Sequence, residues 1–197
     1  MKVFGILVAG WILGGIAIVA MAVVGGHREK RAEMGRPEFG GPAVPRAALP
    51  GAFHVPVQGI RADELRDDFE QPRGGGRLHG ALDILAPRGT PVVAAVDGTI
   101  RKLFNSGAGG IAIYQFDEKQ ERVYYYAHLE RYADDLAEGL YVEQGRVIGY
   151  VGTSGNAPAD TPHLHFAIET LTPEKVWWKG TPLNPYTLLT ARASTQP

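Results

Sequence analysis

The sequence predicts an all-β domain preceded by one amino-terminal transmembrane helix. Three observations support this prediction: residues 3–26 carry no charge, residues 27–58 are rich in Pro and Gly with little periodicity, and short β-rich runs separated by Gly turns follow from Gly59. A chain of 197 residues suits one ordinary domain with accessory segments. We therefore expect a membrane anchor over 1–26, a tether over 27–58, a folded domain over 59–189 and a tail over 190–197.

The uncharged run at the amino terminus is long enough to cross a bilayer. As a helix, Val3 to Gly26 would extend about 36 Å, which exceeds the hydrocarbon thickness of a typical membrane. The small residues Ala20 and Ala22 also fit a signal-peptidase site, so cleavage is the alternative to an uncleaved anchor. Arg28, Lys30 and Arg31 follow the run, and this charge bias alone favours a cytoplasmic domain.

The expected domain consists of short strands. Asp117 to Gln120 form a polar turn between two candidate strands, which predicts a hairpin, and only Arg131 to Glu138 has a helical pattern. We expect a two-sheet antiparallel sandwich, similar to a hybrid barrel, with a groove. The candidate strands are Thr90 to Val96, Thr99 to Phe104, Ile111 to Phe116, Arg122 to His128, Arg146 to Val151 and Leu164 to Glu169, with Val142 leading into a further turn.

Composition narrows the classes of function. The formal net charge is −1, and the sequence has no basic stripe of the kind found in nucleic-acid-binding proteins. The chain contains no cysteine, which excludes disulfides, thiolate metal sites and a cysteine nucleophile. Any metal must therefore be held by histidine or carboxylate side chains.

Four of the six histidines fall into three short clusters within the expected domain. His163 and His165 are two residues apart, so on a strand they project from the same face, opposite Leu164. His79 and Asp83 are four apart and also share a face on a strand; a helix would align them too, but Gly80 weighs against a helix.

Two histidines and one carboxylate are ligands suited to a divalent metal ion. Three protein ligands leave one position open for water, which is typical of catalytic rather than structural sites. A bound ion lowers the pKa of that water to about 7 and polarises a carbonyl oxygen. Further histidines nearby would transfer protons or stabilise an oxyanion.

Five motifs in the domain resemble the lysostaphin-type (LytM-like) zinc endopeptidases, which act on peptidoglycan. The similarity extends from about Val55 to Leu189, and Leu183-Asn184-Pro185 resembles the family's carboxyl-terminal edge. Its motifs are HGALD at 79–83, APRGTPVVAAVDGTI at 86–100, YAHL at 126–129, VEQGRVIGYVGTSGNA at 142–157 and PHLHF at 162–166.

The resemblance implies one zinc ion held by His79, Asp83 and His165. It further implies that His128 and His163 are the catalytic residues, and that the substrate is a peptide of peptidoglycan. This substrate requires the domain to lie outside the cytoplasmic membrane, so we expect a single-pass membrane protein with a periplasmic or extracytoplasmic domain. Members of the family that only bind and activate other wall enzymes have typically lost some of these five residues, and this sequence keeps all five.

One family feature is missing from the sequence. The family's site often includes a tyrosine near the first motif, but residues 72–77 read PRGGGR. Tyr126 is the nearest alternative in sequence. Adjacent residues on a strand face opposite ways, so we give Tyr126 little weight. Arg73 and Arg77 are candidates for contact with substrate, but such side chains are more often solvated or packed at a domain edge, so neither is assigned to the site.

Other classes of protein fit the sequence less well. A non-catalytic wall-binding scaffold, or an activator of other wall hydrolases, is the alternative function. Residues 93–104 and 142–152 look like halves of a lipoyl- or biotin-carrier domain, but Lys102 lies inside a candidate strand rather than at a hairpin tip. A non-heme iron oxygenase usually has a tighter His-x-Asp spacing than His79 and Asp83.

Overall fold

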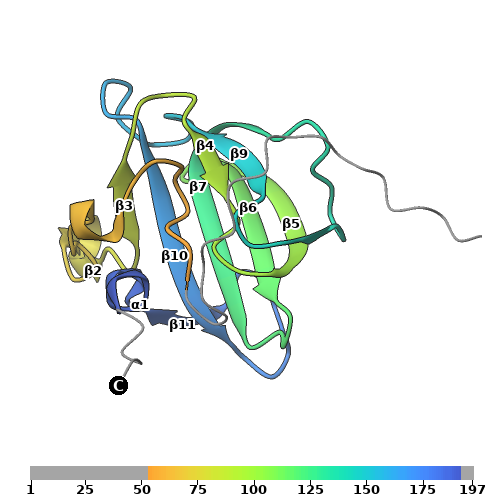
Figure 1. Cartoon of the computed structure of the whole chain (residues 1–197). Helices are drawn as coiled ribbons and strands as arrows, with labels where there is room; N and C mark the ends of the chain where they lie inside the picture. Colours follow the sequence, from red (N-terminus) through yellow and green to blue (C-terminus); the bar gives the residue numbers. More distant parts are fainter. Residues whose placement is uncertain (1–52, 192–197) are drawn as a thin grey trace, which may run out of the picture. The chain divides into compact units, whose positions relative to one another are not determined.

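Antiparallel pairing of strands with one apolar face each organises the domain (Figure 1). The structure is a computed structural model and describes residues 53–191. The predicted anchor at 1–26 and nearly all of the tether lie outside the described residues, as does most of the tail. Within residues 53–191, no helix is both long and apolar enough to span a membrane.

Eleven strands and three short helices make up the described part of the chain. The strands are β1 (Pro72–Arg73), β2 (Arg77–Leu78), β3 (Leu82–Leu85), β4 (Pro91–Val93), β5 (Gly98–Ser106), β6 (Gly110–Asp117), β7 (Arg122–Tyr132), β8 (Tyr141–Val142), β9 (Val147–Val151), β10 (His163–Leu171) and β11 (Gly180–Leu183); the helices are the 3₁₀ turns η1 (Ala62–Glu64) and η2 (Gly74–Gly76), and α1 (Pro185–Thr190).

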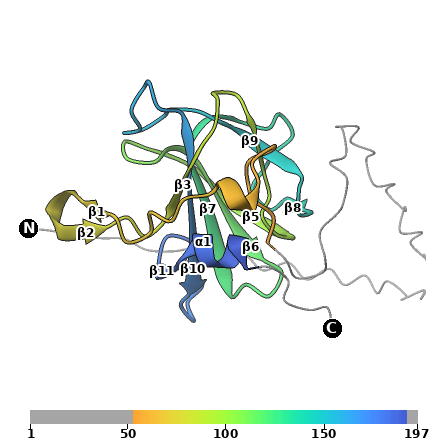
Figure 2. The same cartoon turned by 60° about the vertical axis from the view of Figure 1, so that its left-hand side comes forward.

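Nine of the strands belong to one antiparallel sheet, in the order β11-β10-β7-β6-β5-β8; off this path, β3 pairs with β10, β9 with β7 and β4 with β9. The prediction of an all-β, antiparallel domain is confirmed, but the expected two-sheet sandwich is wrong. β7 is long enough to pair with β10 through residues 122–127 and with β9 through residues 129–132. Because β10 and β9 both pair with this strand, the nine strands form one bent sheet; within residues 53–191 the only other sheet is the β1–β2 hairpin, at the edge of the domain (Figure 2).

The larger of two hydrophobic clusters lies on one face of this sheet, and a smaller one contains Phe116, Val123 and Leu171. Leu82 and Ile84 of β3 and Leu164, Phe166 and Ile168 of β10 are all at most 2% exposed. Burying a side chain of this size contributes about 1.5–3 kcal/mol. The alternation along both strands sends the intervening polar residues to the opposite face, which is where the histidines lie.

Two local predictions require correction. The helical pattern of Arg131 to Glu138 does not form a helix, because Arg131 and Tyr132 extend β7 and the following residues form turns held by Ala133 N–H···O=C Ile148, 3.0 Å. Helix α1 was not predicted, although Asn184 caps it by accepting a hydrogen bond from Tyr186 N at 2.9 Å and Pro185 begins it. An Asn-Pro pair is a known start for a helix.

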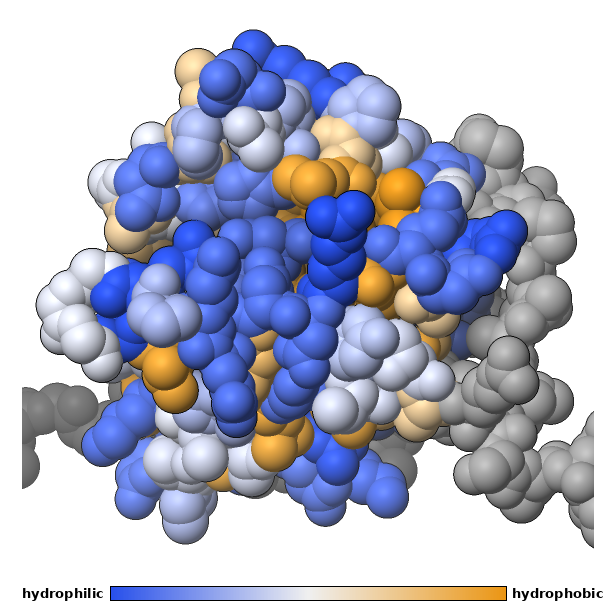
Figure 3. Space-filling model, turned by 90° about the vertical axis from the view of Figure 1, so that its left-hand side faces the viewer, coloured by the Kyte–Doolittle hydropathy of each residue, from blue (hydrophilic) through white to orange (hydrophobic). Residues whose placement is uncertain are grey.

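The face of the domain drawn in Figure 3 has both hydrophilic and apolar residues. Hydrophilic residues cover most of the face in Figure 3, with apolar residues between them.

A buried hydrogen-bond network supports the sheet beneath the site. The hydroxyl of Tyr126, which is fully buried, donates to Gln115 Oε1 at 2.7 Å and accepts from Ala95 N at 3.0 Å. The Gln115 amide in turn donates to Val96 O at 2.8 Å. Tyr126 therefore points into the core and away from the histidines.

We expect Tyr126→Phe to destabilise the domain by about 1–3 kcal/mol, because two buried polar groups lose their partner. Urea unfolding measures the change as a shift in the midpoint. Tyr141→Phe is the matched control: the Tyr141 hydroxyl also donates a hydrogen bond, to Glu118 at 2.7 Å, but the residue is 47% exposed. The control should change stability by no more than about 0.5 kcal/mol, and equal effects of the two variants would contradict the expectation.

Candidate active site

The pairing of β3 with β10 brings two of the candidate ligands face to face. Asp83 lies directly opposite His165 in the register, with Leu82 opposite Phe166 and Ile84 opposite Leu164 on the core side. His165 Nδ1 and Asp83 Oδ1 are 3.0 Å apart. The prediction that His163 and His165 project from one face of a strand is confirmed, since both belong to β10 while Leu164 points into the core.

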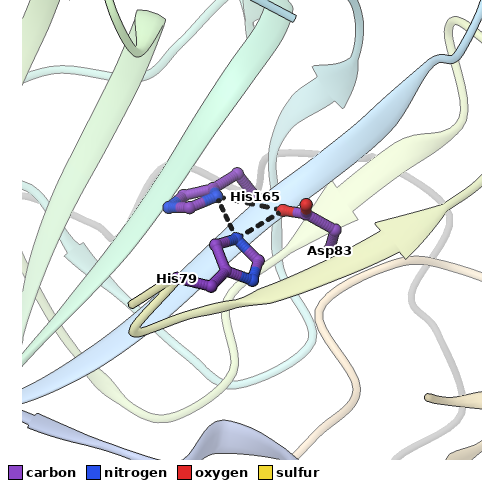
Figure 4. Close-up of side chains that lie close together, drawn as sticks. All are labelled: His79, Asp83 and His165. Carbon is purple, nitrogen blue, oxygen red and sulfur yellow. Dashed lines mark hydrogen bonds and ion pairs between the residues drawn. The ribbon is translucent and has the colours of Figure 1, made fainter. Parts of the chain in front are cut away.

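His79 reaches the same point from outside the strand. β3 begins at Leu82, so His79 and Asp83 do not share a strand as the sequence analysis expected. Gly80 has a φ of 69°, a conformation that favours glycine, and its backbone turn carries the chain from His79 into β3. His79 Nε2 lies 3.1 Å from Asp83 Oδ1 and 3.1 Å from His165 Nδ1 (Figure 4).

The three side chains fit a zinc ion. Their ligand atoms all lie within 4.8 Å of one another. Tetrahedral zinc with ligand bonds of about 2.0–2.1 Å separates neighbouring ligand atoms by about 3.3 Å, close to the 3.0–3.1 Å between the atoms of His79, Asp83 and His165. The set contains nitrogen and carboxylate donors only, as the absence of cysteine required.

Hydrogen bonds within the site shift the pKa values of Asp83 and His79. Burial opposes ionisation of Asp83, but hydrogen bonds from His165 and His79 outweigh it and hold the pKa of Asp83 far below its usual value. Burial likewise lowers the pKa of His79, but the hydrogen bonds to Asp68 and Asp83 outweigh it and raise the pKa to about 9. Asp83 is therefore an anion, and a metal cation competes with a proton for His79.

His128 stands where β7 changes its pairing from β10 to β9. Its φ of 59° is unusual for a residue other than glycine, and such strain is concentrated at functional sites. Its Nδ1 donates to Ser154 O at 2.8 Å, because a carbonyl only accepts, and this leaves Nε2 without a proton. Burial lowers the pKa of His128, which favours the neutral ring.

His163 adopts the same hydrogen-bonding pattern on β10. Its Nδ1 donates to Thr161 O at 2.8 Å, so its Nε2 also carries no proton in the neutral ring. That Nε2 is 3.8 Å from Asp83 Oδ1, and the ring centroid of His163 is 5.0 Å from that of His128. The structure thus brings all five predicted site residues together.

Two residues that the sequence analysis left out also contact the site. Asp68 accepts the His79 Nδ1 proton through its backbone O at 3.2 Å, and its carboxylate accepts from Asp83 N at 3.3 Å. Arg73 Nη2 donates to Asp83 Oδ2 at 2.7 Å. Neither position has a periodic or motif-like spacing to the histidines, so only the fold reveals these contacts. An acidic hollow adjoins Asp68, lined by Asp67, Asp68, Glu70, Gln71 and Asn184.

Comparison with known proteins identifies the family. The sequence profile of peptidase family M23 matches residues 77–185. The chain belongs to peptidase family M23. This confirms the predicted resemblance to lysostaphin-type endopeptidases, and the match includes all five converging residues.

Relatives with similar sequences are named as endopeptidases. The chain is 35% identical over 125 residues to the L-Ala--D-Glu endopeptidase of Bacillus subtilis, covering 59% of this chain and 37% of that protein. It is 33% identical over 90 residues to the peptidoglycan DD-endopeptidase ShyC of Vibrio cholerae, covering 46% of this chain and 20% of that protein. The chain therefore spans well under half the length of either relative.

The fold agrees with this M23 assignment. The catalytic domain of lysostaphin from Staphylococcus simulans superposes with a TM-score of 0.55 and 27% identity, covering 66% of this chain and 96% of that domain. The bent antiparallel sheet is thus the architecture of an M23 domain.

We expect Asp68→Ala to weaken zinc binding about 10-fold, because groups that orient metal ligands typically contribute 10–100-fold to affinity and the backbone carbonyl that accepts from His79 remains. Competition with a chromophoric chelator measures the affinity. Asp67→Ala is the control: this neighbouring carboxylate accepts from Asn184 Nδ2 at 3.1 Å and not from the site. Equal affinities of the two variants would show that Asp68 does not orient the ligands.

Proposed function

We propose that this chain is a zinc-dependent endopeptidase that hydrolyses the peptide cross-links of bacterial peptidoglycan. The observation that supports this most is the convergence of His79, Asp83 and His165 beside two further histidines, His128 and His163. Membership of peptidase family M23 and the named activities of the relatives supply the substrate class.

The residues divide into a metal-holding set and a proton-transferring set. His79 Nε2, Asp83 Oδ1 and His165 Nδ1 would hold the zinc ion. When bound, zinc supplies Lewis acidity and lowers the pKa of a bound water to about 7. His79 is fixed for this task because its other nitrogen is engaged by Asp68.

His128 and His163 would move the protons. Each ring donates Nδ1–H to a backbone carbonyl, so in the neutral ring Nε2 carries no proton. Such a nitrogen accepts a proton from the attacking water, and the resulting N–H then stabilises the oxyanion or protonates the leaving amine. The ring centroid of His128 is 5.6 Å from that of His165, so the proton acceptors stand beside the metal-holding residues.

We further propose that the domain acts outside the cytoplasmic membrane, held by the uncharged run of residues 3–26. A peptidoglycan substrate requires this location, and the Pro- and Gly-rich segment that follows the run suits a tether. A reporter fused after Pro197 tests the orientation: activity of a cytoplasm-specific reporter would reject the proposal.

The first expected outcome concerns cleavage. The purified full-length chain in mild detergent, incubated with cross-linked peptidoglycan and zinc, should release new muropeptides that disappear when a chelator is added. Mass spectrometry of the products identifies the bond that is cut, which differs between the named relatives. A folded, zinc-loaded protein that releases nothing would favour the alternative function, a non-catalytic wall-binding scaffold.

The second expected outcome separates the two sets of residues. His128→Ala and His163→Ala should keep zinc but lower turnover by about 10²–10⁴-fold, the usual contribution of a proton-transferring side chain. His165→Ala should lose both zinc and activity. His54→Ala is the control, since His54 lies outside the cluster and pairs by its backbone with Ala95. Loss of zinc in the His128 or His163 variant would reject the division of roles.

A further inference from the structure

The carboxylate of Asp83 is shared between two sets of partners. Oδ1 faces His79 Nε2 at 3.1 Å and His165 Nδ1 at 3.0 Å, while Oδ2 accepts from Arg73 Nη2 at 2.7 Å. We propose that Arg73 is a positioning residue that holds Oδ2 and so restricts Asp83 to a single metal-facing oxygen. The proposal rests on the zinc site of the proposed function and adds a residue to it.

The β1–β2 hairpin places the Arg73 side chain beside Asp83. Arg73 pairs with Arg77 across β1 and β2, and the turn between them consists of three glycines. Gly75 and Gly76 have φ values of 77° and 74°, which allow the tight reversal. The Arg73 side chain is 35% exposed, so it reaches from the hairpin to the partly buried Asp83 without being enclosed itself.

The position of Arg73 is not optimised for stability. Its Nε is buried and has no hydrogen-bond partner, and an unpaired buried donor is unfavourable. The guanidinium instead directs Nη2 to Asp83 Oδ2, at 2.7 Å.

Restricting Asp83 has a chemical consequence. A carboxylate that is free to rotate can present both oxygens to a metal ion, and the second oxygen would then occupy a further coordination position. A catalytic zinc site keeps one position open for water or substrate. By engaging Oδ2, the guanidinium of Arg73 keeps that position open.

The positive charge of Arg73 and its hydrogen bond to Asp83 have opposite effects on zinc affinity. This difference makes the proposal testable. A guanidinium near a cation site repels the cation, so loss of its charge alone would strengthen zinc binding. Loss of the Oδ2 hydrogen bond leaves Asp83 less well oriented and would weaken it. The sign of the change in affinity shows which effect prevails.

The experiment compares Arg73→Ala with Arg77→Ala in the full-length chain. Arg77 lies on the same hairpin, carries the same charge and is exposed, and its side chain has no ion pair or hydrogen bond within residues 53–191. Zinc affinity is measured by chelator competition, and the coordination geometry by the visible absorption of the cobalt(II)-substituted protein. Arg73→Lys, which keeps the charge and one donor, is the third variant.

We expect Arg73→Ala to bind zinc about 10–100-fold more weakly and to show the weaker cobalt absorption of a higher coordination number, while Arg77→Ala matches the unaltered protein. Arg73→Lys should lie between the two. An alanine variant with unchanged or tighter zinc binding and an unchanged cobalt spectrum would overturn the proposal, as would a lysine variant weaker than alanine. Neither readout depends on peptide cleavage, so absence of peptidase activity in a zinc-binding protein would reject the proposed function and leave the role of Arg73 intact.

Discussion

The register between β3 and β10 is the constraint on which the site depends. It places Asp83 opposite His165 on one face, and Leu82 opposite Phe166 on the other. A slip of one residue would turn the polar side chains into the core and the apolar ones out, because side chains alternate along a strand. The fully buried Leu82, Leu164 and Phe166 thus fix the site from beneath.

A second constraint is the change of partner along β7. One edge of β7 pairs with β6, and the other edge pairs first with β10 and then with β9. His128 lies between these last two pairings and has a left-handed backbone conformation. The same bend sets the His128 ring beside His163 and His165. Backbone carbonyls of Ser154 and Thr161 then fix the tautomers of His128 and His163, so the loops around the sheet determine which nitrogens are free to react.

Much of the domain follows from local pattern. Alternation along residues 163–168 predicted both the strand and its metal-facing side, and the polar turn at 117–120 predicted the β6–β7 hairpin. The five motifs identified the family and, by resemblance, all five residues that converge. These features depend on the alternation of apolar and polar side chains and on turn residues, both of which can be recognised in the sequence alone.

The sequence by itself determined the β class, the family and the residues of the candidate site. The tertiary structure alone decided that the strands form one bent sheet, that residues 131–138 are not helical, and that Asp68 and Arg73 contact His79 and Asp83 of the candidate site. These features depend on which distant segments pair. Arg73 contacts Asp83 only because the β1–β2 hairpin folds beside β3. No periodic pattern in the sequence predicts a contact of that kind.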